Sequence, residues 1–358
     1  MSTLKFKTSR ALENEPVTIK SEPIEGLTGL RGHICNPYCE GCVFPASYAD
    51  GVVTAIVTAP AGEYELEPVT EEAQPSVRFE GVGEGDRFEV KINGKTFTSY
   101  VYDPALAKPY LGPVMTSFGE SFTRLDFETK EHPHHRSIFF GVGDVTLDGG
   151  AENIDFWNEP ANCGIQRHTG IKNVTETPAY SSFTAGTVWC SHDGAPMLDA
   201  ECEYKFYPQP EGVRYIDLTL TYRASYGGVT FGKTKEAGPL GVRMADPLRA
   251  ERGGYIANSY GAKGEGECWG RAANWCVYGG ELSGNKVGIA VFDDPQNERY
   301  PTTWHIRDYG LFAANNLYFR GGLRIEAGET LTYKYRVVLF EGTAEDAKIG
   351  DRFIVYAK

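Results

Sequence analysis

The sequence predicts an all-β protein, because it combines alternating apolar and polar runs, frequent turn-forming residues and few helix signals. Its 358 residues include 42 glycines and 20 prolines, and 13% are aromatic. Aromatic residues favour strands, whereas glycine and proline favour the turns between strands. At this length the chain can form one large domain or two smaller ones and bury a core without disulfide bonds.

The clearest pair of strands is predicted at residues 89–102, on either side of Asn93-Gly94. Asn-Gly between alternating residues is the strongest local signal for a two-residue hairpin turn. Four later runs have a similar strand character and read AECEYKFYP, RYIDLTLTYRA, KVGIAVFD and ETLTYKYRVVLFEG. Only TAEDAKIGDRFIVYA, near the end, suggests a short helix. These elements predict packed antiparallel sheets.

The overall charge narrows the choice of partner. A formal net charge of -13 repels polyphosphate and anionic lipid surfaces, so we expect neither nucleic acid nor membrane as a partner. The first residues contain no stretch like a signal peptide, and no apolar run approaches the ~18 residues that span a bilayer. We expect a soluble, cytoplasmic protein that binds a small neutral molecule and is compatible with homo-oligomer formation.

A histidine cluster at residues 132–136 is the strongest candidate site. Three of the seven histidines of the chain, His132, His134 and His135, occupy four positions and are followed by Arg136. In a strand, His132 and His134 share one face and His135 points the other way. Imidazole suits acid/base catalysis or metal binding near neutral pH. We interpret the three histidines as catalytic and Arg136 as substrate-binding; the alternative is a loop with solvated or capping histidines.

Two carboxylates and an indole follow this cluster closely. Asp144 and Asp155 could supply acid or base groups, and Trp157 could supply a platform for a sugar ring. Asp155 and Trp157 are therefore candidate substrate-binding residues. The alternative for Trp157 is a place in the core.

A second cluster, at residues 233–243, places charges among small and apolar residues. Lys235 and Arg243 are candidate substrate-binding residues, and Glu236 is a candidate general base or metal ligand. Charges in such surroundings tend to be paired, so a structural ion pair between Glu236 and one of the two cations is the alternative.

A third cluster, at residues 300–315, contains catalytic candidates His305 and Asp308. Its remaining candidates are assigned to substrate binding, namely Trp304, Arg307 and Asn315. In an extended conformation His305 and Arg307 share a face. A hydrogen-bonded core position is the alternative for His305.

Two metal sites are conceivable from residue type and spacing. The first, for a divalent ion, would draw its imidazoles from His132, His134 and His305. The second would use thiolates in a C-x3-C-x2-C spacing, namely Cys35, Cys39 and Cys42. Reduced loop cysteines are the alternative for this second group.

Several long motifs, taken in order, resemble the bacterial DUF6807 family, often labelled PmoA-like. They read HPHHRSIFFGVGDV with DFW, TKEAGPLGVRMADPLR, WGRAANWCVYGG and GIAVFDDPQNERYPTTWHIRDYGLFAAN. The resemblance runs from about residue 85 to about 342, with fainter similarity before it. It implies a β-sandwich associated with carbohydrate catabolism. Methane oxidation, which the label suggests, is discounted because that protein is an integral membrane protein and this chain has no apolar run that could span a bilayer.

The polar residues named in the three clusters match the family's motifs, with two departures. Phe292-Asp293-Asp294-Pro295 stands where many relatives read Phe-Asp-His-Pro, so a histidine role there is absent or has passed to Asp294. The cysteine-rich stretch at 35–42 looks like an insertion.

The resemblance also organises the chain into parts. We expect an N-terminal β region at 1–85 packed on the main domain, a DUF6807-like domain at 86–345 and a tail at 346–358. The expected architecture is a large double β-sandwich that resembles the galactose mutarotase supersandwich.

The leading functional hypothesis is a carbohydrate-active enzyme, such as a lyase or hydrolase of keto-sugars. His134 or His305 with Glu236 would abstract a proton beside a carbonyl, helped by Arg136 or a divalent ion. One alternative is a mutarotase-like isomerase without a metal. Another is a non-catalytic sugar-binding protein with Trp157 and Trp304 as stacking platforms.

Overall fold

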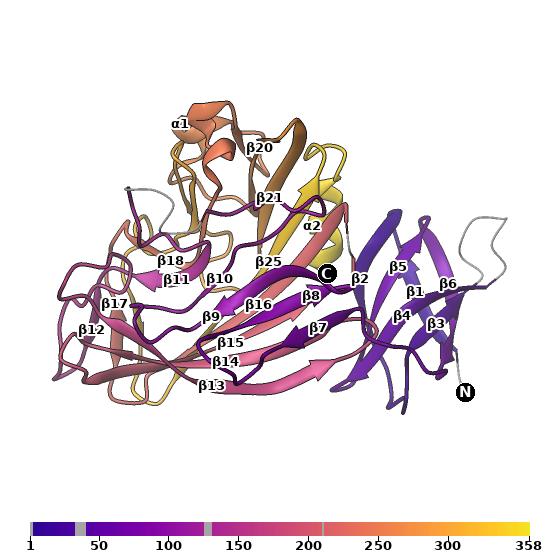
Figure 1. The fold of residues 1–358 in the computed structure, drawn as a ribbon, viewed down its shortest axis with the longest axis horizontal. Coiled ribbons are helices and arrows are strands. Elements are labelled where there is room, and N and C mark those ends of the chain that lie inside the picture. The colour runs from indigo at the N-terminus through magenta and orange to yellow at the C-terminus, as the bar shows by residue number, and fades with distance from the viewer. Residues whose placement is uncertain (1–2, 33–40, 125–130, 210) are drawn as a thin grey trace.

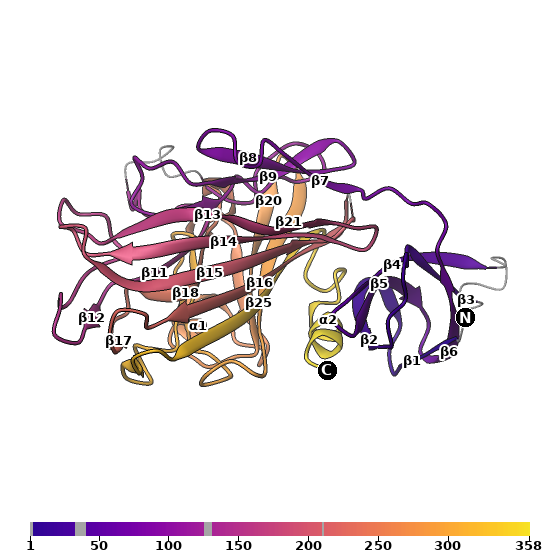
Figure 2. The same cartoon turned by 90° about the horizontal axis from the view of Figure 1, so that it is seen from below.

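The computed structural model describes residues 3–32, 41–124, 131–209 and 211–358, and most of their regular structure is antiparallel β-sheet (Figure 1). The N-terminal strands form one six-stranded sheet beside the larger body of the molecule (Figure 2). In spatial order this sheet consists of β1 (Leu4–Thr8), β6 (Gly62–Val69), β3 (Gly29–Gly32), β4 (Cys42–Ala49), β5 (Val52–Ala59) and β2 (Leu12–Lys20).

The larger body contains two eight-stranded sheets and a small third one. The first runs β22 (Trp304–Ile306), β23 (Leu311–Ala314), β18 (Ala237–Arg243), β11 (Ile138–Val142), β10 (Tyr110–Leu111), β9 (Lys95–Val101), β8 (Arg87–Ile92) and β7 (Val77–Glu80). The second runs β13 (Ile165–Glu176), β14 (Ser181–Cys190), β15 (Pro196–Phe206), β16 (Val213–Arg223), β25 (Thr330–Glu341), β21 (Asn285–Asp293), β20 (Trp275–Leu282) and β19 (Tyr255–Asn258). The small sheet contains β12 (Val145–Leu147), β17 (Val229–Phe231) and β24 (Leu323–Ile325).

The two large sheets pack face to face around one apolar core. Period-two alternation along β15 and β16 directs one set of side chains into this core. Aromatic rings join the sheets, as between Phe88 and Phe183, whose centroids are 4.8 Å apart, and between Tyr100 and Tyr204 at 5.4 Å. This arrangement confirms the predicted all-β double sandwich.

The local elements follow the sequence closely. The Asn93-Gly94 turn joins β8 to β9, and both turn residues have the positive φ that such hairpins require. Strands β15, β16, β21 and β25 confirm the four later runs, and helix α2 (Ile349–Tyr356) confirms the predicted short helix. The other helical segments are the short α1 (Gly264–Cys268), η1 (Asp246–Leu248) and η2 (Ala250–Arg252). No helix in the described part of the chain is long and apolar enough to cross a membrane.

The outer face of the second sheet binds α2 and the N-terminal sheet. Phe353 of α2 packs on Phe292 at 5.4 Å between ring centroids. Tyr215 of β16 donates a hydrogen bond of 3.0 Å to Glu15 of β2, and Arg352 of α2 pairs with the same carboxylate. A shared buried ion pair therefore ties the N-terminal sheet to the sandwich.

Candidate active site

The histidine cluster forms a tight turn before β11, and not the strand that the alternation argument assumed. His132 has a φ of +46°, and the His135 amide donates a hydrogen bond of 3.0 Å to the His132 carbonyl. Proline at 133 fixes its own φ and removes a donor, which suits a turn better than a ladder of hydrogen bonds. The turn gathers the three imidazoles that a strand would have separated.

The three rings lie against one another and against Tyr309. His132 stacks on Tyr309 with centroids 4.7 Å apart and planes within 4°. His134 lies 5.9 Å from His132 and 4.4 Å from His135, in an edge-on arrangement to both. His135 is buried, whereas His132 and His134 are only partly buried. His132 and His134 are therefore the imidazoles that a ligand can reach.

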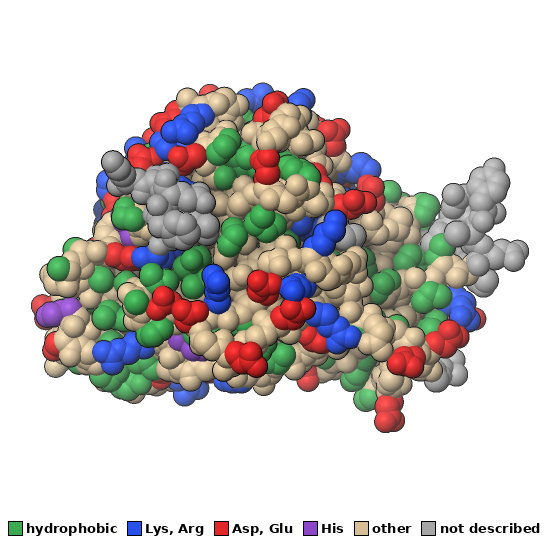
Figure 3. Space-filling model, viewed as in Figure 1, with side chains coloured by type: hydrophobic (Ala, Val, Ile, Leu, Met, Phe, Trp, Pro, Cys, Tyr) green, Lys and Arg blue, Asp and Glu red, His purple; other side chains and the backbone are tan. Residues whose placement is uncertain are grey.

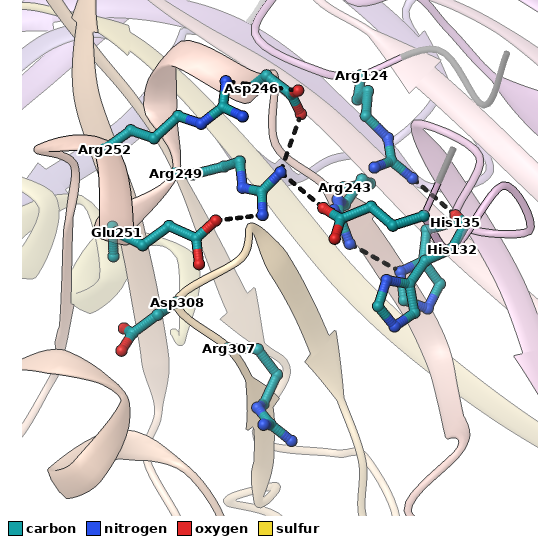
Figure 4. A network of polar contacts seen from close by, with 12 residues as sticks. Arg124, His132, His135, Arg243, Asp246, Arg249, Glu251, Arg252, Arg307 and Asp308 are labelled. Atoms are coloured by element: carbon teal, nitrogen blue, oxygen red, sulfur yellow. Dashed lines mark hydrogen bonds and ion pairs between the residues drawn. The ribbon is translucent and has the colours of Figure 1, made fainter. Parts of the chain in front are cut away.

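A network of arginines and acids supports the turn from behind (Figure 4). The guanidinium of Arg243 lies 3.1 Å from Nδ1 of His135, and it also donates to Glu131 at 3.2 Å. Arg249 pairs with the same carboxylate at 2.6 Å. Arg124 donates a hydrogen bond of 2.7 Å to the His132 carbonyl. Because Arg243 is fully buried, it acts as a support for His135 and cannot bind substrate in this conformation.

All the histidines of the site are held neutral at pH 7. Burial and, after it, the charge of nearby Lys108 lower the pKa of His134 to about 4. The pKa of His132 is lowered mainly by burial and next by the charge of Arg243. The pKa of His135 lies well below its usual value, mainly because of burial and next because of His134. Neutral imidazole carries one donor and one acceptor nitrogen, so each ring can offer a hydrogen-bond acceptor at neutral pH.

A buried ion-pair triad lies next to His134. Arg136 makes a bidentate pair with Glu159, with N–O distances of 2.9 and 2.5 Å. Lys108 lies 3.1 Å from the same carboxylate and donates to the Trp157 carbonyl at 2.6 Å. Arg136, predicted to bind substrate, is thus engaged with Glu159 inside the protein.

Trp157 and Asp155 are structural parts of the segment after β12. Trp157 is fully buried between His135, at 5.6 Å between ring centroids, and His305, at 6.4 Å. Asp155 accepts hydrogen bonds from the amides of Trp157 and Asn158 at 2.8 and 2.9 Å. The core alternative for Trp157 therefore describes its position, and its ring links the first cluster to the third.

The second cluster contributes one exposed ion pair. Lys235 lies 3.4 Å from Glu236, and both side chains are partly exposed ahead of β18. The charge of Glu236 raises the pKa of Tyr309, although burial is the largest cause of that rise. Glu236 therefore lies on the same side of the site as the Tyr309 and His132 stack.

His305 lies in the third cluster, on β22, and is buried beneath Trp269, whose ring centroid is 6.4 Å away. Burial and, after it, the charge of Arg307 lower the pKa of His305 to about 4, whereas a hydrogen bond with the Lys235 backbone opposes the shift. The buried position considered as the alternative for His305 therefore describes where its ring lies.

The other members of the third cluster face different ways. Arg307 pairs with Glu265 of α1 at 2.8 Å and stands 5.4 Å from the Tyr309 ring. Asp308 points away from Arg307 (Figure 4) and lines a groove of about 1180 Å³ between α1, β19 and α2. The Asp308 side chain is therefore directed to that groove, apart from the histidine turn.

Trp304 and Asn315, predicted to bind substrate, are buried structural residues. The Trp304 indole donates to the Ala273 carbonyl at 2.9 Å. The Asn315 amide donates to the carbonyls of Thr234 and Lys235 at 3.2 and 2.9 Å. It therefore clamps the loop after β23 to the loop before β18.

The geometry adds residues that the sequence argument did not single out. They are Tyr309, which stacks on His132; Glu159 and Lys108, which form the buried triad; and Glu131, Glu265 and Trp269, which contact the three clusters. Two of these residues fall inside the motifs that resemble the family. Tyr309 lies four positions after His305, and Trp269 is the first residue of WGRAANW, so both could have been noticed in the sequence.

The predicted metal sites are not assembled among the described residues. No three His, Cys, Asp or Glu side chains in that part of the chain gather closely enough to hold a metal ion. His305 is separated from the histidine turn by the Trp157 ring, which explains why it does not join His132 and His134. Cys35 and Cys39 lie outside the described residues, and Cys42 begins β4.

The structure is that of a double β-sandwich protein with a histidine-rich turn, residues 132–135, directly before β11. The profile of DUF6807, a family of unknown function, matches residues 87–353, so the chain belongs to the DUF6807 family. No curated protein matches the sequence. Among solved structures, the galactose 1-epimerase of Lactobacillus acidophilus NCFM is similar with 12% identity and a TM-score of 0.34, over 75% of this chain and 100% of that one.

Proposed function

We propose that the protein is a carbohydrate-active enzyme that transfers protons on a sugar at the histidine turn. The observation that carries the proposal is the pair of neutral, partly exposed imidazoles of His132 and His134, whose ring centroids are 5.9 Å apart. Perturbed titratable groups held together by a supporting network are typical of catalytic sites. On the face seen in Figure 3, acidic, basic and apolar side chains are interspersed.

The preferred reaction is elimination or hydrolysis of a keto-glycoside. One imidazole removes the proton on the carbon between the carbonyl and the anomeric carbon. The electrons of that C–H bond form a double bond, the glycosidic bond breaks, and the leaving oxygen takes up a proton; addition of water then completes hydrolysis. Arg307 and Lys235 are the cations that could stabilise the enolate oxygen, and each would have to turn from its carboxylate partner, Glu265 at 2.8 Å and Glu236 at 3.4 Å.

A mutarotase-like reaction is the second candidate, and one observation favours it. Both exposed imidazoles are neutral, so one can accept the anomeric hydroxyl proton while Glu236 or the other imidazole assists at the ring oxygen. This reaction moves protons between oxygen atoms only. It therefore leaves every carbon-bound hydrogen in place.

Proton NMR in deuterated water separates the two reactions. The purified protein is offered methyl glycosides, free aldoses and 3-keto glycosides. Deuterium entering beside the carbonyl supports elimination, and faster anomeric exchange without deuterium uptake supports the mutarotase. His134→Ala should reduce the active reaction by 10²-fold or more, the usual range for loss of a general base.

His192→Ala is the matched control, because His192 is exposed on a loop outside the three clusters. Equal losses in both variants, or no reaction with any sugar of the panel, would refute the assignment of the histidine turn as a catalytic site.

A further inference from the structure

We propose that Arg243 fixes His135 as the tautomer protonated at Nε2, so that His135 positions the neighbouring imidazoles but cannot take a proton from a substrate. The inference rests on the proposed function and deepens it, because it separates the imidazoles that can act as a base from the one that cannot. By residue type alone, His135 is as good a base as His132 or His134. The difference lies in the group that contacts each ring.

The contact behind the inference joins two buried side chains (Figure 4). Nη1 of Arg243 lies 3.1 Å from Nδ1 of His135, and the two residues are 0% and 1% exposed. A guanidinium has N–H donors and no acceptor. Burial lowers the pKa of Arg243 to about 10, which still leaves the group protonated at pH 7. The hydrogen bond therefore runs from Arg243 to the lone pair of Nδ1, and the single proton of neutral His135 is on Nε2.

The guanidinium of Arg243 is held on its other sides as well. Its Nη2 donates to Glu131 at 3.2 Å, and its central carbon lies 4.9 Å from the centre of the Tyr309 ring. The backbone amide of Arg243 donates to the Ser137 carbonyl at 2.7 Å, which fixes the start of the side chain. The donor is therefore already in place for Nδ1 of His135 before any ligand binds.

The same hydrogen bond excludes His135 as a base. Its Nδ1 lone pair is occupied by Arg243, and its Nε2 already carries the proton. A second proton on Nδ1 would set an N–H against a group that can only donate, and it would add a buried charge beside a guanidinium. By contrast, Nδ1 of His132 has no hydrogen-bond partner among the described residues, and His134 is partly exposed. These two rings keep the lone pairs that the proposed reaction needs.

His135 contacts both of these rings. Its centroid lies 4.4 Å from that of His134 and 5.1 Å from that of His132, and its plane is within 8° of the His132 plane. A ring that Arg243 holds in one orientation gives the other two a fixed surface to pack on. Arg243 is therefore a positioning residue that acts through His135.

Nitrogen-15 NMR of the full-length protein, labelled at histidine, tests the tautomer at pH 7 without any substrate. The chemical shift of a ring nitrogen shows whether it carries a proton, and the His135 signals are identified by their loss in His135→Asn. We expect a proton on Nε2 and none on Nδ1. A wild-type ring with its proton on Nδ1, or with protons on both nitrogens, overturns the proposal. This measurement decides the assignment even if a variant of Arg243 fails to fold.

Arg243→Gln should change the tautomer. The glutamine NH2 group can replace the guanidinium as the donor to Glu131, which turns the amide oxygen towards His135 and requires a proton on Nδ1. Arg249→Gln is the matched control, because Arg249 pairs with the same carboxylate at 2.6 Å and makes no hydrogen bond to His135 in the described part of the chain. This control should keep the proton on Nε2. An unchanged tautomer in Arg243→Gln, or the same change in both variants, overturns the role of Arg243.

The rate of the proposed reaction separates positioning from catalysis. In His135→Asn the amide oxygen lies near the place of Nδ1 and can accept the same hydrogen bond from Arg243. We expect this variant to stay within about tenfold of the wild-type rate, whereas loss of a general base costs about 10²-fold or more. A loss as large as that of His134→Ala overturns the proposal. The expected tautomers in a protein that converts no sugar uphold the role of Arg243 and refute the proposed function alone.

Discussion

Replacement of Glu159 by glutamine should destabilise the protein strongly, because this carboxylate neutralises two buried cations. Only 17% of the Glu159 side chain is exposed, with 8% for Arg136 and 1% for Lys108. The substitution keeps the shape of the side chain but removes its charge. Breaking a buried ion pair by removing one partner costs about 3–5 kcal/mol, because the remaining charge stays desolvated.

The loss of stability in Glu159→Gln should stay within this range because Lys108 can lose its charge. Burial already lowers the pKa of Lys108, and Glu159 opposes that effect, so removal of the carboxylate should lower the pKa further and let the amine become neutral. Arg136 has no such escape, since guanidinium stays protonated. One uncompensated cation then remains, and the expected penalty is that of a single broken pair.

Thermal and urea unfolding followed by circular dichroism measure the effect. At about 2 °C per kcal/mol for a domain of this size, the melting temperature should fall by about 6–10 °C. Glu63→Gln is the control, because its ion pair with Lys7 is exposed and should leave the melting temperature unchanged. Similar melting temperatures for Glu159→Gln and wild type would refute the assignment of Glu159 as the counter-charge of the triad.

Two further predictions concern pH. The reaction rate should stay level from pH 8 to about 5 and then fall with an apparent pKa of about 4, as His134 takes up a proton; a midpoint near 6.5 in a pH–rate profile would contradict its burial. The pKa of His305 is about 4 in the folded protein, against about 6.5 for an unperturbed histidine, so its contribution to stability is full above pH 6.5 and is lost as the pH falls towards 4. The free energy of unfolding, measured with urea, should therefore be lower at pH 4.5 than at pH 7.5. In His305→Gln this difference should be smaller by up to about 3 kcal/mol, and an equal difference in both proteins would contradict the low pKa of His305.

Features set by neighbouring residues could be predicted from the sequence, whereas features set by distant contacts could not. The hairpin at Asn93-Gly94 depends on two backbone conformations and an alternating pattern, and both are local. Strand alternation does not describe the His132 to His135 segment, because Pro133 and the positive φ of His132 belong to a tight turn. The residue types drew attention to the right place, but the backbone arranged them differently.

The roles of individual site residues depended on partners far along the chain. Arg243 is 108 positions from His135, and nothing in either motif indicates that their side chains meet. Trp304 and Asn315 look like binding residues by type, yet their polar atoms are used by Ala273 and by the 234–235 carbonyls. Side-chain type identifies what a residue can do, and burial with available partners decides whether that capacity is already used.

The two sides of the site have different physical characters, and this difference supports the choice of a sugar as ligand. Behind the histidine turn, Arg243 and Arg249 share Glu131. Burial and then Arg243 lower the pKa of His132, and Glu131 opposes this shift. Around His305 the neighbouring rings are aromatic, namely Trp157 and Trp269, each with its centroid 6.4 Å away. A ligand that fits both sides needs an apolar face, hydroxyl groups and no net charge. A pyranose has all three, whereas a phosphorylated or carboxylated ligand would meet neutral imidazoles and cations already paired with acids.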